Sequence, residues 1–156
     1  MRPMDMINLK IADILDRNGR ISNRKIAKQL NVSEKMVRTR LGNMIKDGTL
    51  IFPAQFNLDA FPEMFLAVLG IKVKSSLENC LNTLRYLPYV LFAITVTGRY
   101  DIFAVVLFNS RKMLNNIINK EIQKTEEVVD WETFVVFDYA DIGISASKLW
   151  ALMERQ

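Results

Sequence analysis

A cation, an aromatic hydroxyl and a carboxylate follow one another in the stretch TVTGRYDIF, residues 95–103. Arg99, Tyr100 and Asp101 come directly after Gly98, between a run of β-branched residues and a second apolar run. Glycine in such a place is typical of a tight turn that needs a positive φ angle. Tyr100 and Asp101 could serve as an acid–base pair. Taken by itself, the stretch favours a turn whose polar side chains only face solvent.

Composition argues against catalysis. The 156 residues include no histidine, which removes the commonest general base and the commonest metal ligand. The single cysteine, Cys80, lies on an apolar helical stripe, so we expect a buried thiol and a reducing cytosol. No stretch approaches the roughly 18 uncharged apolar residues of a membrane span, and the start lacks the apolar core of a signal peptide. We therefore expect a cytoplasmic protein that is not an enzyme and binds neither metal nor cofactor.

Charge divides the chain into two unequal parts. Residues 1–52 contain eleven Lys and Arg against five Asp and Glu, whereas residues 53–156 contain ten against twelve. A basic first third, followed by a mildly acidic remainder, predicts a polyanion-binding domain joined to a second domain with a different role.

The basic part has the pattern of three helices. Apolar residues recur at helical spacing over residues 5–17, and Gly19 ends this helix. Ser22 and Ser33 are candidate N-caps of the next two helices, and Asn31 tolerates a left-handed turn between them. Two short helices joined by about four residues predict a helix-turn-helix. The apolar face expected for the third helix consists of Val37, Leu41, Met44 and Ile45.

In a helix-turn-helix the second helix of the motif enters the major groove of double-stranded DNA. Its first residues meet base edges, where Arg and Lys match guanine and Glu can accept from cytosine. A solvated helix face is the alternative for these charges. The candidate base readers are Glu34, Lys35, Arg38 and Thr39, beside the cap Ser33. The candidate phosphate contacts, which fix register without reading sequence, are Ser22, Arg24, Lys25, Lys28 and Arg40.

The remainder predicts a ferredoxin-like domain. Leu50, Ile51 and Phe52 form a short strand or wing before Pro53, and residues 53–63 form a packed linker. Strands are then expected at 64–74, 89–97, 101–108 and 126–137, with helices after the first and third. This β-α-β-β-α-β order gives an α+β body over residues 64–138. Its strands are apolar on both faces, so a second subunit is expected to cover the face without helices.

A C-terminal tail over residues 139–156 is predicted to contain a helix that docks on a subunit. The apolar side of this helix comprises Leu149, Trp150, Leu152 and Met153.

Three stretches resemble the Lrp/AsnC, or feast/famine, transcription regulators. They are NGRISNRKIAKQLNVSEKMVRTRLGNMIKDGTL at 18–50, VTGRYDIF at 96–103 and WETFVVF at 131–137, and the likeness covers roughly residues 4–137. The resemblance implies a winged-type helix-turn-helix followed by a domain that forms dimers, commonly assembled into octamers, and senses an amino acid or related metabolite. In this family the effector lies between subunits, against the Gly-x-Tyr-Asp turn and the last strand. The matching positions here are Gly98, Arg99, Tyr100, Asp101, Thr133, Phe134, Val135 and Val136.

The residue types of the turn suit an amino-acid effector. Gly98 lets backbone N–H groups approach an α-carboxylate, Asp101 can pair with an α-ammonium group, and Tyr100 can donate a hydrogen bond while it packs. Arg99 stands at a variable position of the motif. The chain departs from the family at Asn8, where an aspartate is usual, and at Asn31, where many helix-turn-helices have glycine. Its tail is also longer than expected.

Three functions stay open at this stage. The principal one is a sequence-specific DNA-binding regulator modulated by a small amino acid. The second is an architectural protein that wraps DNA without an effector, in which the turn serves assembly alone. The third is an enzyme on the ferredoxin-like domain, which the absence of histidine and of a second carboxylate near Asp101 disfavours.

Overall fold

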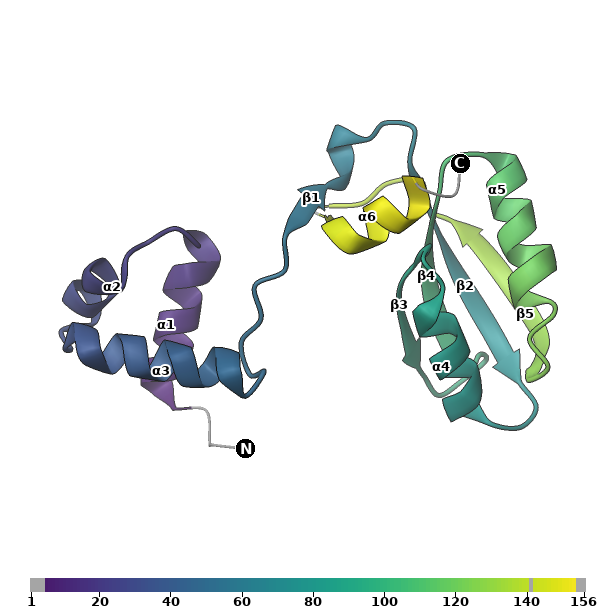
Figure 1. The fold of residues 1–156 in the computed structure, drawn as a ribbon. Helices are drawn as coiled ribbons and strands as arrows, with labels where there is room; N and C mark the ends of the chain where they lie inside the picture. Colours follow the sequence, from purple (N-terminus) through teal and green to yellow (C-terminus); the bar gives the residue numbers. More distant parts are fainter. Residues whose placement is uncertain (1–4, 141, 154–156) are drawn as a thin grey trace. The chain divides into compact units, whose positions relative to one another are not determined.

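The computed structural model describes residues 5–140 and 142–153, and the chain divides into two compact units at Phe52. The first unit ends there, and the second begins at Pro53. Each unit has its own hydrophobic core. Figure 1 shows the three helices of the first unit and the sheet and helices of the second.

The first unit consists of three helices around a small apolar core. They are α1 (Met6–Arg17), α2 (Asn23–Leu30) and α3 (Glu34–Lys46). The predicted caps are confirmed, because the Ser22 and Ser33 side chains accept hydrogen bonds from the first turns of α2 and α3. Asn31 has a φ angle of 53°, as expected for the left-handed turn between these helices. The core comprises Ile11, Leu15, Ile26, Ala27, Val37 and Met44.

Two details predicted for the first unit are corrected: the burial of Ile45 and a strand at residues 50–52. Ile45 was placed on the buried face of α3, but 49% of its surface is exposed in this unit. Residues 50–52 do not form a strand; the nearest strand is β1 (Gln55–Asn57), on the other side of Pro53. The apolar, β-rich composition of 50–52 is not enough, because the described residues offer this segment no pairing strand.

An antiparallel four-stranded sheet forms the body of the second unit. Its strand order is β3-β4-β2-β5, which is the order of a ferredoxin-like fold and confirms the predicted fold class. The elements are β2 (Phe65–Val73), α4 (Leu77–Tyr86), β3 (Val90–Thr95), β4 (Ile102–Phe108), α5 (Arg111–Asn116) with the π-helical turn η2 (Ile117–Ile122), and β5 (Val128–Val135).

The two faces of this sheet differ. Ile71, Leu69 and Ala104 alternate onto the face that is fully buried with Cys80 and Leu84 of α4. Burial raises the pKa of the Cys80 thiol to about 11, so this cysteine is not a nucleophile at neutral pH. The opposite face stays partly open, and its residues form two rows across the sheet. One row is Phe92, Val105, Val68 and Phe134, and the next is Ile94, Phe103, Gly70 and Glu132.

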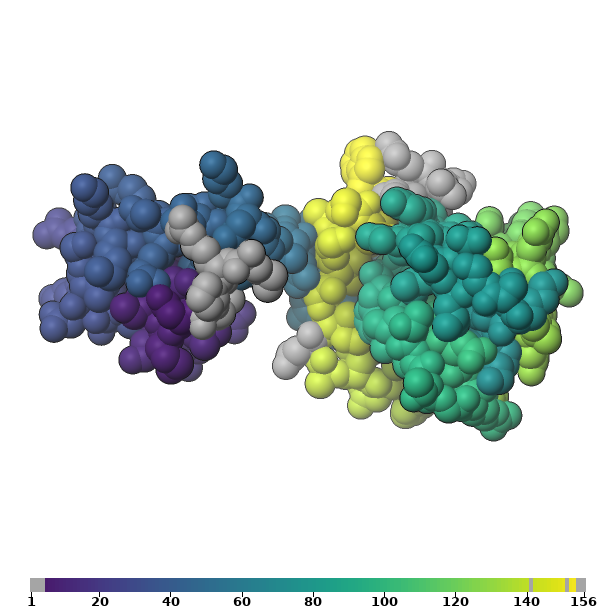
Figure 2. All heavy atoms as spheres, turned by 90° about the horizontal axis from the view of Figure 1, so that it is seen from below, coloured from purple at the N-terminus to yellow at the C-terminus, as the bar shows by residue number. Residues whose placement is uncertain are grey.

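The expected linker and tail both belong to the second unit. β1 pairs antiparallel with β6 (Gly143–Ser145), a strand that was not predicted, and the 3-10 turn η1 (Leu58–Ala60) buries Leu58 completely. The tail helix α6 (Ala146–Met153) lies beside β1 (Figure 1) and against the teal and green surface of its own unit (Figure 2).

The tail prediction is therefore half right. Leu149 and Leu152 are buried in the core of the second unit of the same chain, whereas Trp150 and Met153 are exposed to 65% and 58%. Leu149 and Leu152 lie three positions apart on the side of the helix that packs inside the unit, and Trp150 and Met153 are left for another surface. The part of the predicted helix over residues 154–156 lies outside the described residues.

Candidate DNA-binding helix and effector turn

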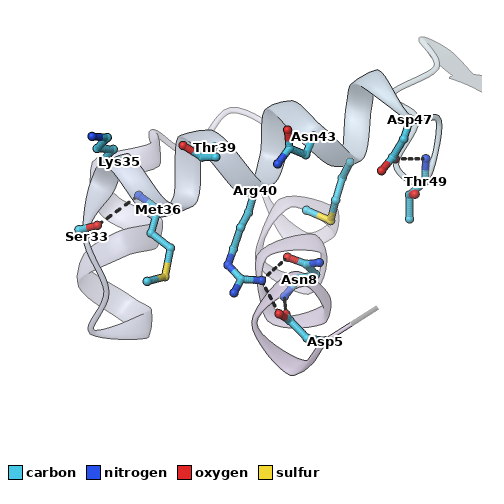
Figure 3. A pocket seen from close by; sticks show the side chains of 11 residues that line it. Asp5, Asn8, Ser33, Lys35, Met36, Thr39, Arg40, Asn43, Asp47 and Thr49 are labelled. Carbon is cyan, nitrogen blue, oxygen red and sulfur yellow. Dashed lines mark hydrogen bonds and ion pairs between the residues drawn. The ribbon is translucent and has the colours of Figure 1, made fainter. Parts of the chain in front are cut away.

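The predicted base readers lie at the start of α3. Ser33 Oγ accepts a hydrogen bond of 3.2 Å from the backbone N–H of Met36, which fixes the first turn (Figure 3). Lys35, Arg38 and Thr39 are exposed and Glu34 is half-buried. The structure thus presents the predicted reading positions on the surface of the unit, which a helix that enters a groove requires.

Glu34 and Arg38 are paired with each other. Their side chains meet at 2.8 Å, one helical turn apart, and remain 43% and 70% exposed. Sequence reasoning gave each of them a separate base. An exposed pair of this type contributes only about 0.3–0.5 kcal/mol, so DNA can replace it at little cost.

Arg40 is not a free phosphate contact in this structure. Its guanidinium forms an ion pair with Asp5, at the N-cap of α1, and donates a 2.9 Å hydrogen bond to Asn8 Oδ1 (Figure 3). The backbone N–H of Asn8, and then Arg40, hold the pKa of the Asp5 carboxyl below its usual 3.8. We call Asp5, Asn8 and Arg40 the α1–α3 clamp, and assign Arg40 to positioning α3.

A hollow of about 650 Å³ runs along the same face of the first unit. Lys35, Thr39 and Asn43 contribute to it from successive turns of α3, beside the clamp (Figure 3). Asn43 was left out of the predicted reading set. Its spacing of four residues from Thr39 was the signal that placed it on the same side of the helix.

The other predicted phosphate contacts surround α2. Ser22 Oγ accepts from the Lys25 N–H at 3.4 Å and caps the helix. Arg24, Lys25 and Lys28 are exposed, and none of them forms an ion pair with another residue among 5–140 and 142–153. Their charges are therefore available to a polyanion.

In the second unit, the turn between β3 and β4 is organised by Asp101. Gly98 has the expected positive φ angle, 129°. Asp101 Oδ2 accepts a 2.9 Å hydrogen bond from the Val73 N–H, and its Oδ1 lies 3.6 Å from Lys72 Nζ. Both partners stand where the register of β2 and β5 shifts. Asp101 thus holds an irregular strand end, and its oxygens are already engaged.

Tyr100 lies on the open face of the sheet, directly over Gly70. A Cβ atom built on Gly70 would come within 2.8 Å of the Tyr100 ring, so only glycine leaves room for it. The ring meets Phe103 and Phe134 edge-on at centroid distances of 5.5 and 6.4 Å. Its hydroxyl donates a hydrogen bond to Glu132.

Arg99 also contacts this aromatic ring. Its guanidinium carbon lies 5.4 Å from the Tyr100 ring centroid, and one nitrogen lies 3.4 Å from Glu132 Oε2. The arginine side chain is nevertheless 79% exposed, so its outer nitrogens face solvent. We call Gly70, Arg99, Tyr100, Glu132 and Phe134 the effector-turn cluster.

The last strand supplies only part of the predicted set to this cluster. Phe134 pairs with Val68 on the open face, whereas Thr133 and Val135 point to the opposite face because neighbouring strand residues alternate. Val136 donates its backbone N–H to Leu66 O at 2.9 Å. The structure therefore brings Phe134 to Tyr100 but separates Thr133 and Val135 from it.

Sequence reasoning missed Gly70 and Glu132. Only Gly70 carried a clear signal, because a lone glycine in an apolar strand marks the close approach of another group. Glu132 shares its strand with Asp130, so its residue type alone did not mark it.

Among residues 5–140 and 142–153, no three His, Cys, Asp or Glu side chains are grouped as a metal site would require. Over the same residues, no helix has the length and apolar character needed to cross a membrane.

Comparisons with known proteins agree with this architecture. A family model described as "Winged helix-turn-helix DNA-binding" matches residues 4–51, and one described as "Lrp/AsnC ligand binding domain" matches residues 66–140. The chain is similar to an HTH-type transcriptional regulator of Methanocaldococcus jannaschii, with 31% identity over 76% of this chain and 82% of the relative. It is also similar to the regulator LysM of Sulfurisphaera tokodaii, with 29% identity over 87% and 96%.

The structure of AsnC from Escherichia coli superposes with a TM-score of 0.78 and 25% identity, over 90% of this chain and 97% of that one. The three-helix unit, the β3-β4-β2-β5 sheet and these relatives lead to one conclusion. The chain belongs to the Lrp/AsnC family of DNA-binding transcriptional regulators, which are not enzymes.

Proposed function

We propose that this regulator binds specific DNA sequences through α3 and that a small amino acid, or a related metabolite, modulates its DNA affinity or assembly through the effector-turn cluster. The effector-turn cluster is the observation that supports modulation by an amino acid. A strand glycine makes room for Tyr100, whose hydroxyl and neighbouring arginine both meet Glu132. Such a combination of an apolar surface with a few converging polar groups suits a small ligand.

Contacts within the turn change which groups are available to that ligand. Asp101 was expected to pair with an α-ammonium group, but Val73 and Lys72 already occupy its oxygens. Arg99 has further nitrogens for a carboxylate. Glu132 is a half-buried carboxylate beside it, whose contacts with Tyr100 and Arg99 both use Oε2 and leave Oε1 for an ammonium group. We therefore assign the effector's carboxylate to Arg99 and its ammonium group to Glu132.

The open sheet face supports the expected assembly. Phe92, Ile94 and Phe134 are 55%, 50% and 43% exposed on one side of the sheet, which is a large apolar area for a free surface. We propose that a second copy covers this face, that dimers assemble further into octamers, and that the effector binds where copies meet. A regulator of Neisseria meningitidis that shares the fold, with a TM-score of 0.77 and 18% identity, was solved in complex with L-methionine. The proposal keeps the protein in the cytoplasm with the DNA.

A screen of the twenty amino acids for a thermal shift of the full chain tests the effector directly. A hit should shift the melting temperature of the wild type, and Arg99→Gln should remove most of that shift. Arg85→Gln is the matched control, because Arg85 also stacks on its neighbouring tyrosine, at 5.5 Å, but outside the cluster. Equal shifts in the wild type and Arg99→Gln would contradict the proposed carboxylate site.

Architectural wrapping of DNA is the second candidate, since the free cations around α2 bind phosphate without reading sequence. Under that function the cluster would serve assembly alone, and no amino acid would alter DNA binding. DNA protection that ignores sequence would favour this candidate over the first.

A further inference from the structure

A second hollow lies on the second unit, apart from the turn at residues 98–101. It has a volume of about 560 Å³, within the range of pockets that hold small organic ligands. No residue of the effector-turn cluster lines it. Its walls come from the start of β3, the α5–η2 helix and the tail helix α6, and they comprise Tyr89, Asn109, Ser110, Lys112, Met113, Asn116, Ile117, Lys120, Glu121 and Leu152.

Apolar side chains form the inner part of this hollow. Ile117, Leu152 and Tyr89 are 2%, 4% and 7% exposed, so each shows only an edge to the opening. Met113 is half-buried beside them, and its flexible thioether side chain can adapt to ligands of different shape. This lining excludes a fully polar ligand and favours one with an apolar body.

Two lysines stand above the apolar floor. Lys112 and Lys120 are exposed, and neither forms an ion pair with another residue among 5–140 and 142–153. Asn109 and Asn116 add amide donors, and the Ser110 hydroxyl, whose oxygen already accepts from Met113 N, keeps its proton for a further acceptor. One carboxylate, Glu121, opposes two ammonium groups, so the rim has a positive balance.

The helix that carries the lysines is irregular at this place. α5 changes to the π-helical turn η2 at Ile117, and Gln123 N donates to Ile118 O across five residues. Single π turns occur frequently at functional sites, because the extra residue redirects the side chains that follow. Here the turn carries both Ile117 of the floor and Lys120 of the rim.

We propose that this hollow is a second ligand site, for a small monocarboxylate with an unbranched apolar body. The carboxylate binds at Lys112 and Lys120, and the chain lies on Met113, Ile117 and Leu152. This site takes a different class of ligand from the effector turn, because two cations beside an apolar lining stand in place of an arginine–glutamate pair. It stands independently of the function proposed for that turn.

The test titrates octanoate into the full chain labelled at the methyl groups of Ile, Leu and Met, and follows the shifts by NMR. Octylamine, which has the same chain and the opposite charge, is the matched ligand control. The variant Lys112→Gln/Lys120→Gln removes both cations, and Lys74→Gln/Lys124→Gln removes two other exposed lysines of the same unit that do not line the hollow. Far-UV circular dichroism and a melting curve show that each variant is folded.

We expect saturable octanoate shifts centred on Met113, Ile117 and Leu152, with affinity at least tenfold weaker in Lys112→Gln/Lys120→Gln and unchanged in the control variant. Octylamine should bind at least tenfold more weakly than octanoate. The proposal is overturned if the shifts centre on Ile94 of the open sheet face. It is also overturned if both ligands bind alike, if both lysine variants bind like the wild type, or if nothing saturates.

Discussion

The recognition helix and the effector turn use their polar side chains in opposite ways. On α3, Lys35 and Thr39 point away from the unit, and the Glu34–Arg38 pair is exposed and weak. In the turn, Asp101 and Tyr100 are each engaged with partners from neighbouring strands. The exposed face of α3 is supported by the core of the first unit. The effector turn, by contrast, is stabilised by the same residues that were expected to bind the ligand.

This difference changes how a motif should be interpreted. A motif residue can be essential because it builds the site and not because it touches the ligand. In the turn, Asp101 fixes the strand end and Gly70 admits the ring, while Arg99 keeps free nitrogens. On α3, by contrast, two predicted DNA contacts have structural roles: Arg40 belongs to the clamp, and Ser33 caps the helix. Substitutions can show whether each polar residue of α3 and of the turn builds its site or contacts the ligand.

Gly70→Val should be the most damaging change in the second unit. The new side chain would occupy the position of the Tyr100 ring and separate it from Glu132, which we expect to cost about 1–3 kcal/mol in the free energy of unfolding. Chemical denaturation measures this cost. Gly42→Ala on α3 is the control, because nothing lies within 4 Å of its built Cβ, and alanine should stabilise the helix by up to about 1 kcal/mol. Equal effects of the two changes would refute the close packing of Tyr100.

Asp101→Ala should destabilise the protein because the Val73 N–H loses its acceptor, at a cost of about 1–3 kcal/mol. Asp101→Asn keeps an oxygen acceptor and loses only the Lys72 pair, which is partly exposed and worth about 0–1 kcal/mol. Denaturation curves compare the two variants. Asp101→Asn should also keep the response of the protein to the effector. If a folded Asp101→Asn protein no longer responds, the effector's ammonium group binds Asp101 and not Glu132.

Arg38→Ala and Arg40→Ala should separate reading from positioning within one helix. Arg38→Ala should weaken binding to a selected DNA site by about 1–3 kcal/mol if it reads a guanine, with little change in stability. Arg40→Ala should lower the stability of the first unit. Arg40→Lys keeps the charge for a phosphate but has a shorter reach than the guanidinium, whose Nη1 contacts both Asp5 and Asn8, so it should be less stable than the wild type. Full recovery of DNA affinity in a stable Arg40→Lys protein would make Arg40 a phosphate contact after all.

The smallest effect concerns pH and Asp5. Its folded pKa lies below 3.8, the unfolded value, so its ionised form stabilises the fold above that pH, and this contribution is lost as the pH falls through the folded pKa. Asp5→Asn should therefore lower the melting temperature at pH 7 and have no effect well below pH 3.8. Asp16→Asn, another exposed acid of α1, serves as the control. A difference between wild type and Asp5→Asn that stays constant with pH would contradict the clamp.

Local features were predictable from the sequence, and contacts between distant segments were not. Ser22, Ser33 and Gly98 were identified because caps and positive-φ turns depend on residue type and near neighbours. Arg40 and Asp5 lie 35 residues apart, and no periodicity reveals that they meet. The same holds for β6, whose three residues are too short to show a strand pattern and depend on β1 for their pairing.

The central claim is that α3 reads DNA sequence and that a small amino acid modulates this binding. Footprinting of the full chain, on DNA selected by the protein from a random library, tests it most directly when it is repeated with the amino acid found in the thermal-shift screen. We predict discrete protected half-sites about one helical turn apart, whose protection changes with the amino acid in the wild type but not in Arg99→Gln. Uniform protection of any DNA, unaffected by every amino acid, would contradict the claim.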